Sequence, residues 1–102
     1  IAYAIALCEA NNLNKILIGV NNPQKTIYKD TTARFIENYN MLLKNAYNKN
    51  ILIENPLQGL TKKQISMLLK KNNVDPMATY SCYKGTKKPC GECSACIKRR
   101  EI

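Results

Sequence analysis

Four cysteines gather in the last quarter of the chain at a spacing that suits a metal ion. Seven residues separate Cys82 from Cys90, and two residues separate Cys90 from Cys93 and Cys93 from Cys96. A two-residue spacing lets one tight turn aim two sulfurs at a point about 2.3 Å from each, and Gly91 lets the backbone of that turn approach. Four thiolates leave no coordination position open for water or substrate. The spacing therefore predicts a closed, structural Zn²⁺ site.

Other thiol chemistries fit this spacing less well. An iron–sulfur cluster also takes four thiolates, and Cys90, Cys93 and Cys96 match the C-x-x-C-x-x-C run of bacterial ferredoxins, although the fourth cysteine lies upstream. Disulfides or a redox dithiol need a secreted or thioredoxin-like setting, and the start of the chain shows no secretory leader. Cys8 lies in an apolar stretch, where a free cysteine is usually a small buried hydrophobe. Zinc is the favoured metal, and an iron–sulfur cluster is the alternative.

Apart from the cysteine cluster, the sequence shows no group of residues typical of a catalytic or cofactor site. There is no histidine, which excludes imidazole acid–base chemistry and histidine-ligated metals in this chain. Only four glycines are present, and none recur at the spacing of a phosphate-binding loop. Asp30 precedes a predicted helix, where it acts as a cap or, alternatively, binds substrate. Metal binding is therefore the chemistry that the residues themselves predict.

The chain is strongly basic. Its formal charge is +9, from sixteen Lys and Arg against seven Asp and Glu, and such a charge attracts phosphate-rich partners. The basic residues are scattered, however, and four thiolates bound to one Zn²⁺ lower the charge from +9 to +7. Nucleic acid is therefore not expected as a direct partner. No apolar run approaches the roughly 20 residues that span a bilayer, so no membrane partner is expected either.

Apolar spacing predicts the elements that precede the cysteines. The first ten residues are mostly apolar and predict a helix buried on most sides. A continuous apolar run over residues 15–20 predicts a strand buried on both faces, as in a parallel sheet. From Thr31 or Thr32 to about Asn48, apolar residues recur at intervals of three and four. That pattern predicts a long amphipathic helix.

Two further elements complete the alternation. A second apolar run over residues 51–53 predicts another strand, and a T-x-x-Q capping box at 61–64 predicts a helix that ends near 71–73. Helix, strand, helix, strand and helix is the order of βαβ units with helices around a parallel sheet. The sequence therefore predicts the α/β fold class.

The domain prediction follows from what such a sheet requires. Two strands leave the faces and edges of a parallel sheet unprotected, so we expect the missing strands upstream of Ile1. Residues 1–79 are predicted to be the C-terminal part of an α/β domain. Residues 80–102, where apolar periodicity ends, are predicted to be a separate four-cysteine zinc module. The chain is thus expected to be the C-terminal part of a longer protein.

Several short motifs, taken in order, resemble the QueC family of 7-cyano-7-deazaguanine synthases, which act in queuosine and archaeosine biosynthesis. The cysteine module resembles the zinc-binding tail of that family. Other landmarks lie upstream in the order found in the family. The matching motifs are Gly19-Val20-Asn21, Tyr28-x-Asp30, Phe35-Ile36, Pro56-Leu57, Leu60-Thr61-Lys62, Ser81-Cys82-Tyr83, Pro89-Cys90-Gly91-x-Cys93 and Cys96-Ile97-x-Arg99.

The resemblance implies an adenine-nucleotide hydrolase-like, Rossmann-like fold and a cytoplasmic ligase, often a homodimer. The implied enzyme activates the carboxylate of 7-carboxy-7-deazaguanine with ATP, converts it with ammonia to an amide, and dehydrates the amide to the nitrile with further ATP. The resemblance places the zinc ligands at Cys82, Cys90, Cys93 and Cys96, in a structural role beside the active site. Substrate contacts are expected at Asn21, Tyr28 and Asp30.

The sequence departs from the family pattern in two places. The ATP-binding S-G-G-x-D-S loop is expected upstream of Ile1, so the 102-residue chain alone is expected to be inactive. Residues 27–35 read I-Y-K-D-T-T-A-R-F where the family has G-Y-P-D-C-R-P-E-F. This difference leaves open a QueC-like paralogue with another substrate. A zinc ribbon that binds RNA or a protein through the Lys-rich segment 84–100 is the remaining alternative.

Overall fold

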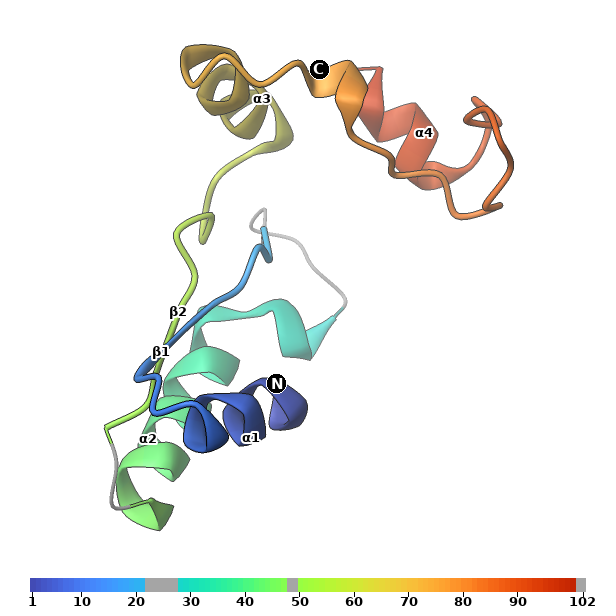
Figure 1. Ribbon diagram of the computed structural model, residues 1–102. Coiled ribbons are helices and arrows are strands. Elements are labelled where there is room, and N and C mark those ends of the chain that lie inside the picture. The colour runs from blue at the N-terminus through green and yellow to red at the C-terminus, as the bar shows by residue number, and fades with distance from the viewer. Residues whose placement is uncertain (22–27, 48–49, 101–102) are drawn as a thin grey trace. The chain divides into compact units, whose positions relative to one another are not determined.

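The computed structural model describes residues 1–21, 28–47 and 50–100. The chain forms two compact units, Ile1–Gly59 and Leu60–Ile102. Figure 1 traces the first unit in blue to green and the second in yellow to red. The boundary predicted between residues 79 and 80 concerns the domains of a whole protein, and it stays a prediction. Among the described residues, no helix combines the length and apolar character needed to cross a membrane.

The first unit is a small α/β structure in which helices and strands alternate as predicted. Its two strands pair in parallel, with Ile16 opposite Ile53. The connection between the strands contains a short 3-10 helix and the longest helix of the chain. The elements are α1 (Ala2–Ala10), β1 (Lys15–Leu17), η1 (Lys29–Thr31), α2 (Ala33–Ala46) and β2 (Leu52–Glu54).

Helix α2 is fixed by its cap and by its apolar face. The Thr32 hydroxyl accepts a hydrogen bond from the Phe35 N–H at 3.2 Å, so the helix begins where the sequence predicted. Ile36 and Leu43 lie seven residues apart, two turns along the same face, and both are buried. The helix ends at Ala46, and the predicted end at Asn48 lies outside the described residues.

The core of the first unit lies on one face of the two-stranded sheet. Ile16 and Ile53 point to this face, and helices α1 and α2 both pack against it (Figure 1). Leu43 and Ile53 are almost completely buried, at 1% and 2% exposed. The buried core residues are Ile5, Cys8, Ile16, Ile36, Leu43, Ile51 and Ile53.

The opposite face of the sheet is open, which corrects two predictions. The prediction that β1 is buried on both faces is wrong for this chain, because Leu17 is 66% exposed. The prediction that the first helix is buried on most sides is also wrong, because Tyr3 is 91% exposed and Leu7 is 62% exposed. The physical reason is that the described residues supply one layer of helices, and no described element covers the second face of the sheet.

The second unit contains the last helices and the cysteines. The predicted capping box is present, because the Thr61 hydroxyl accepts from the Gln64 N–H while the Gln64 side chain accepts from the Thr61 N–H. Ser66 is the most buried residue of this helix. The elements are α3 (Lys62–Lys71), η2 (Pro76–Ala78) and α4 (Ser94–Arg99).

Candidate metal centre

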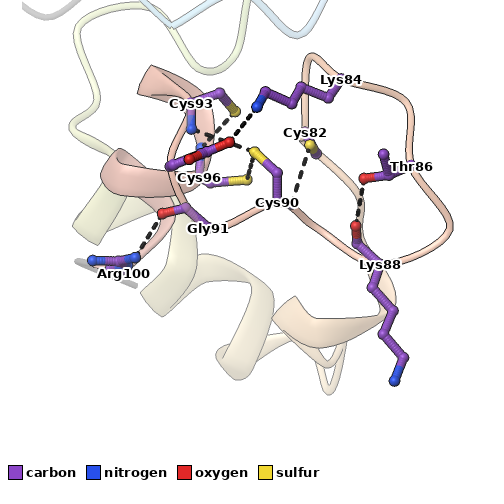
Figure 2. Close-up of polar contacts among 10 residues, drawn as sticks. Cys82, Lys84, Thr86, Lys88, Cys90, Gly91, Cys93, Cys96 and Arg100 are labelled. Atoms are coloured by element: carbon purple, nitrogen blue, oxygen red, sulfur yellow. Dashed lines mark hydrogen bonds and ion pairs between the residues drawn. The ribbon is translucent and has the colours of Figure 1, made fainter.

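The start of α4 brings the cysteines together. Cys93 is the N-cap of α4, and its Sγ accepts a hydrogen bond from the Cys96 N–H at 3.4 Å. This places Cys96 in the first turn of the helix, facing the loop that carries Cys90. Cys82 reaches the same point from the segment that follows η2. Figure 2 shows the side chains of the four predicted ligands converging.

The distances between the sulfurs suit one tetrahedral metal ion. The four Sγ atoms all lie within 4.8 Å of one another. The Sγ atoms of Cys90 and Cys96 are 3.9 Å apart, close to the roughly 3.8 Å edge of a regular tetrahedron with metal–sulfur bonds of about 2.3 Å. Cys82 and Cys96 are buried, while Cys90 and Cys93 are half-buried. The cluster could therefore hold one metal ion, and its donor set fits zinc.

Peptide N–H groups point at the sulfurs and favour the thiolate form. The Cys90 N–H donates to the Sγ of Cys82 at 3.4 Å, and the Cys93 N–H donates to the Sγ of Cys90 at 3.4 Å. The first of these bonds is the main reason that the pKa of Cys82 falls from its ordinary 9.0 to about 5. The N–H of Tyr83 is the main cause that lowers the pKa of Cys93.

The surroundings of Cys96 disfavour its thiolate form. The N–H of Gly91 lowers the pKa of Cys96, but burial and the neighbouring thiols outweigh it and raise the pKa to about 11. Four adjacent sulfurs cannot all carry negative charge without a compensating positive ion. Gly91 adopts a positive φ of 77°, which turns the backbone between Cys90 and Cys93 and which glycine tolerates best. A divalent metal ion would supply the missing charge.

Basic side chains form an ion pair and hydrogen bonds with residues that neighbour the cysteines in sequence. Lys84 forms an ion pair with Glu92, which raises the pKa of Lys84 (Figure 2). Arg100 donates to the carbonyl of Gly91 at 2.6 Å, and Arg99 donates to the hydroxyl of Ser81 at 3.1 Å. Sequence reasoning missed these arginine contacts. The only available signal was a basic pair at the end of the last helix, where cations satisfy exposed carbonyl groups.

Asp30, one of the predicted substrate residues, lies at a cavity in the first unit. The cavity has a volume of about 290 Å³, and Asp30 lines it together with Ile1, Ile18, Val20, Phe35 and Tyr39. The residues Ile18 and Val20 follow the carboxyl end of β1, which is the edge where open α/β sheets bind ligands. The rings of Phe35 and Tyr39 meet edge to face, with centroids 5.1 Å apart.

The other two predicted substrate residues lie outside that lining. Asn21 is half-buried directly after Val20, and Tyr28 is 64% exposed just before η1. Among the described residues, the structure therefore brings only Asp30 of the three predicted contacts to the cavity. The role of all three in substrate binding stays a prediction.

Asn55 is a residue at the strand ends that sequence reasoning missed. Its Nδ2 donates to the Val20 carbonyl at 2.7 Å and to the Oε1 of Gln58 at 2.8 Å. This side chain therefore ties the segment after β2 to the segment after β1, beside the cavity. Its Oδ1 is buried without a hydrogen-bond partner among the described residues. An asparagine directly after a predicted strand was the available signal.

Comparison with known proteins places the whole chain in one family. The family model described as queuosine biosynthesis protein QueC matches residues 1–102. The 7-cyano-7-deazaguanine synthase of Porphyromonas gingivalis is 34% identical over 101 residues, covering 99% of this chain and 46% of that protein. The enzyme of the same name from Leptospira interrogans is 34% identical over 107 residues, covering 99% of this chain and 44% of that protein.

A third relative agrees with these two. The 7-cyano-7-deazaguanine synthase of Campylobacter jejuni is 35% identical over 101 residues, covering 97% of this chain and 45% of that protein. The chain therefore spans less than half the length of the curated relatives that it matches. The resemblance predicted from the order of short motifs is confirmed, because the match includes the cysteine cluster and the segments around both strands. This chain belongs to the QueC family.

Proposed function

We propose that this chain is the C-terminal part of a 7-cyano-7-deazaguanine synthase. The proposed enzyme converts 7-carboxy-7-deazaguanine and ammonia to the nitrile in two ATP-dependent stages, through an amide. The observation that carries the proposal is the match of the QueC family model over residues 1–102, which includes four cysteines with converging sulfurs. The parallel strands β1 and β2 would then be part of a Rossmann-like, adenine-nucleotide hydrolase-like sheet.

The metal in this proposal is one structural Zn²⁺ held by Cys82, Cys90, Cys93 and Cys96. All four donor positions of a tetrahedral ion are then filled by protein sulfur, so the ion can polarise neither water nor substrate. Its contribution is to fold residues 79–100, which include α4. That segment has little apolar packing of its own, since Cys82 and Cys96 are its only buried residues among those described. The zinc thus substitutes for a hydrophobic core.

The substrate in this proposal binds at the carboxyl end of β1. A deazaguanine ring is flat and largely apolar, and it carries amino and ring N–H groups along one edge. The cavity offers apolar walls from Ile18, Val20 and Phe35 and one carboxylate, Asp30, that accepts hydrogen bonds from such groups. Asn21 and Tyr28 flank the same region in sequence, and we assign them supporting contacts. The divergent residues 27–34 would set substrate preference.

ATP binding is assigned to the rest of the protein. Catalysis of phosphoryl and adenylyl transfer depends on donors positioned around the phosphates, and the sequence of this chain has no glycine-rich phosphate loop. We therefore expect the 102 residues alone to bind zinc and to be inactive toward ATP.

A chimera tests the proposed reaction. The segment of the Porphyromonas gingivalis synthase that matches this chain is replaced by this chain, and nitrile formation from 7-carboxy-7-deazaguanine, ATP and ammonium is followed by mass spectrometry. We expect product, and we expect Asp30→Asn to lower kcat/KM about tenfold or more through loss of a charged hydrogen bond. Asp75→Asn is the matched control, because Asp75 caps η2 in the other unit.

The outcomes separate the candidate substrates. A zinc-loaded, folded chimera that forms no nitrile contradicts the proposed reaction. A chimera that transforms a different carboxylate would identify a QueC-like paralogue. Equal activity of the Asp30→Asn and Asp75→Asn variants would remove Asp30 from the substrate site.

A second candidate function rests on the charge of the second unit. Ten of the sixteen basic residues, but only three of the seven acidic residues, lie within residues 60–102. An RNA-binding zinc ribbon would have such a balance, and its affinity would fall steeply with salt. Tight, salt-sensitive binding of transfer RNA by the zinc-loaded chain would favour this function, whereas weak binding would leave the synthase as the better account.

A further inference from the structure

The hydrogen-bond ladder between β1 and β2 ends where the chain leaves β2. At its start, the Leu52 N–H donates to the Asn14 carbonyl at 2.9 Å. Donors that face the neighbouring strand recur at every second residue, so the next two belong to positions 54 and 56. Position 56 is Pro56, which has no N–H. The backbone of β2 therefore donates no further hydrogen bond to the carbonyl groups that follow β1.

The side chain of Asn55 supplies a link between the two segments at this point. Its Nδ2 donates to the Val20 carbonyl at 2.7 Å, and the two residues are 35 positions apart in the sequence. The same nitrogen donates to the Oε1 of Gln58 at 2.8 Å. A side-chain amide nitrogen carries two hydrogens, so both are used. The orientation of the Asn55 amide is therefore fixed by two partners.

A β-turn holds Asn55 in this position. The Gln58 N–H donates to the Asn55 carbonyl at 3.1 Å, which closes a turn of four residues. Asparagine is favoured at the first position of such a turn and proline at the second, as in this chain. The turn also lies near the end of β1, because a Cβ added to Gly19 would lie 3.9 Å from the Cδ1 of Leu57. Local sequence thus places the Asn55 amide beside the segment that follows β1.

Val20, the residue that Asn55 holds, belongs to the wall of the cavity in the first unit. Val20 and Ile18 supply apolar lining to this cavity of about 290 Å³, and Asp30 supplies its carboxylate. Asn55 does not line the cavity, and its Oδ1 is buried without a hydrogen-bond partner among the described residues. Asn55 therefore acts on the cavity through Val20 and not through contact with a ligand.

We propose that Asn55 is a positioning residue for this cavity. It holds the Val20 carbonyl, and with it the apolar wall against which a flat ring packs. The inference rests on the proposed function, because it takes the cavity as the site of the deazaguanine ring. A wall that is fixed before the ligand binds lowers the cost of binding, since less conformational freedom is lost on association. Asn55 thus sets the affinity for the ring and takes no part in the chemical steps.

Kinetics of the chimera with the Porphyromonas gingivalis synthase test this role. Asn55→Ser keeps a residue that is favoured at the first turn position, but its side chain is too short to make both amide bonds. We expect KM for 7-carboxy-7-deazaguanine to rise about tenfold, because the ground state and the transition state lose the same binding. We expect kcat and KM for ATP to stay within about twofold. A merely structural role would instead lower the amount of active enzyme, and hence the apparent kcat, at unchanged KM.

Two further variants separate the bond to Val20 from the turn itself. Gln58→Leu removes the second partner of the Asn55 amide and leaves the first, so we expect KM to stay within about twofold. Asn55→Leu is similar in size to asparagine, removes the unpartnered Oδ1, and should raise KM as Asn55→Ser does. Unchanged NMR signals of the Leu43 methyl groups in the core show that a variant is folded. Unchanged KM in a folded Asn55 variant, or an equal rise in Gln58→Leu, would overturn the proposal.

Calorimetry without ATP keeps this role distinct from the proposed reaction. We expect the wild-type chimera to bind 7-carboxy-7-deazaguanine and the Asn55→Ser variant to bind it about tenfold more weakly. A chimera that binds the ring in this way but forms no nitrile would contradict the proposed function and leave the role of Asn55 intact. Nitrile formation with a KM that does not depend on Asn55 would overturn this role alone. If the wild-type chimera bound no 7-carboxy-7-deazaguanine, both proposals would be overturned.

Discussion

The side chain of Asn40 makes both a donor and an acceptor hydrogen bond to the backbone of Ile53, so a helix side chain replaces a missing neighbour strand. Ile53 is at the centre of β2 and is 2% exposed, and its peptide group would otherwise be unpaired beside the core. A buried N–H and carbonyl without partners are costly. This one side chain therefore satisfies the outward-facing peptide group at the centre of β2.

Asn40→Ala should destabilise the first unit by about 1–3 kcal/mol, because two hydrogen bonds are lost and the Ile53 peptide group is left unpaired. The measurement is urea unfolding followed by circular dichroism. Asn38→Ala is the control, since Asn38 is exposed on the same helix. Equal midpoints for the two variants would show that the bonds of Asn40 contribute little.

Much of the fold could be predicted from local signals. Helix α2 begins after Thr32, and α3 begins after Thr61, because each cap bonds an N–H within its own first turn. Such contacts depend on residues three positions apart, so they are visible in sequence. The cysteine cluster was predictable for the same reason, since three of its members lie within seven residues and a turn joins them.

The remaining features depend on contacts between distant segments. The apolar run around Leu17 predicts burial on both faces, but periodicity does not say which segment covers each face. The bond between Asn40 and Ile53 joins residues thirteen positions apart and depends on how α2 packs. One signal was present, because Asn40 lies four residues after Ile36 and three before Leu43, which places a polar residue on the buried stripe.

Cys93→Ser should abolish zinc binding while keeping the start of α4. A serine hydroxyl is a poor zinc ligand at neutral pH, but serine is a good N-cap and can still accept the Cys96 N–H. Apparent binding energies of structural zinc are on the order of 10 kcal/mol, so the second unit should lose most of its stability. Metal content by elemental mass spectrometry and thermal unfolding check this result.

Cys8→Ala is the matched control for the metal site. Cys8 is a buried thiol in the core of the first unit, outside the cluster. We expect this variant to retain one zinc per chain and to lose only packing energy. Loss of zinc from Cys8→Ala, or one tightly bound zinc in Cys93→Ser, would contradict the assignment of the four ligands.

Gly91→Ala should weaken zinc binding through backbone strain. Gly91 has a φ of 77°, and an added Cβ would lie 3.5 Å from the Nη2 of Arg100. An alanine in the left-handed region costs roughly 1–2 kcal/mol, and relief of that strain would move Cys90 away from Cys93. Competition with a chromophoric chelator should show an affinity lowered about tenfold.

Gly59→Ala is the control for Gly91→Ala, because it introduces the same kind of backbone strain away from the cysteine cluster. Gly59 has a similar φ of 78°, and nothing lies within 4 Å of its added Cβ. Its substitution should cost comparable stability without changing zinc affinity. If both variants bound zinc as the wild type does, the turn at Gly91 would not be needed to hold the ligands.

Zinc occupancy should fall as the solution is acidified, because protons compete with the metal for the sulfurs. The lowered pKa of Cys82 determines the direction in which the stability of the protein changes with pH. Its pKa in the fold is lowered from 9.0 to about 5, so the stability contributed by its thiolate is complete above about pH 9 and is lost as the pH falls toward 5. Cys93, whose pKa is also lowered, acts in the same direction. Native mass spectrometry should therefore show full loading at about pH 7 and loss of zinc near pH 5.

The pKa of Cys96 predicts how zinc binding is coupled to protons. Because that pKa is raised to about 11, Cys96 holds its proton at neutral pH until the metal displaces it. Calorimetry at about pH 7 in two buffers of different ionisation enthalpy should therefore detect release of at least one proton per zinc. Binding without proton release would mean that all four thiols are already ionised, which the closeness of their sulfurs argues against.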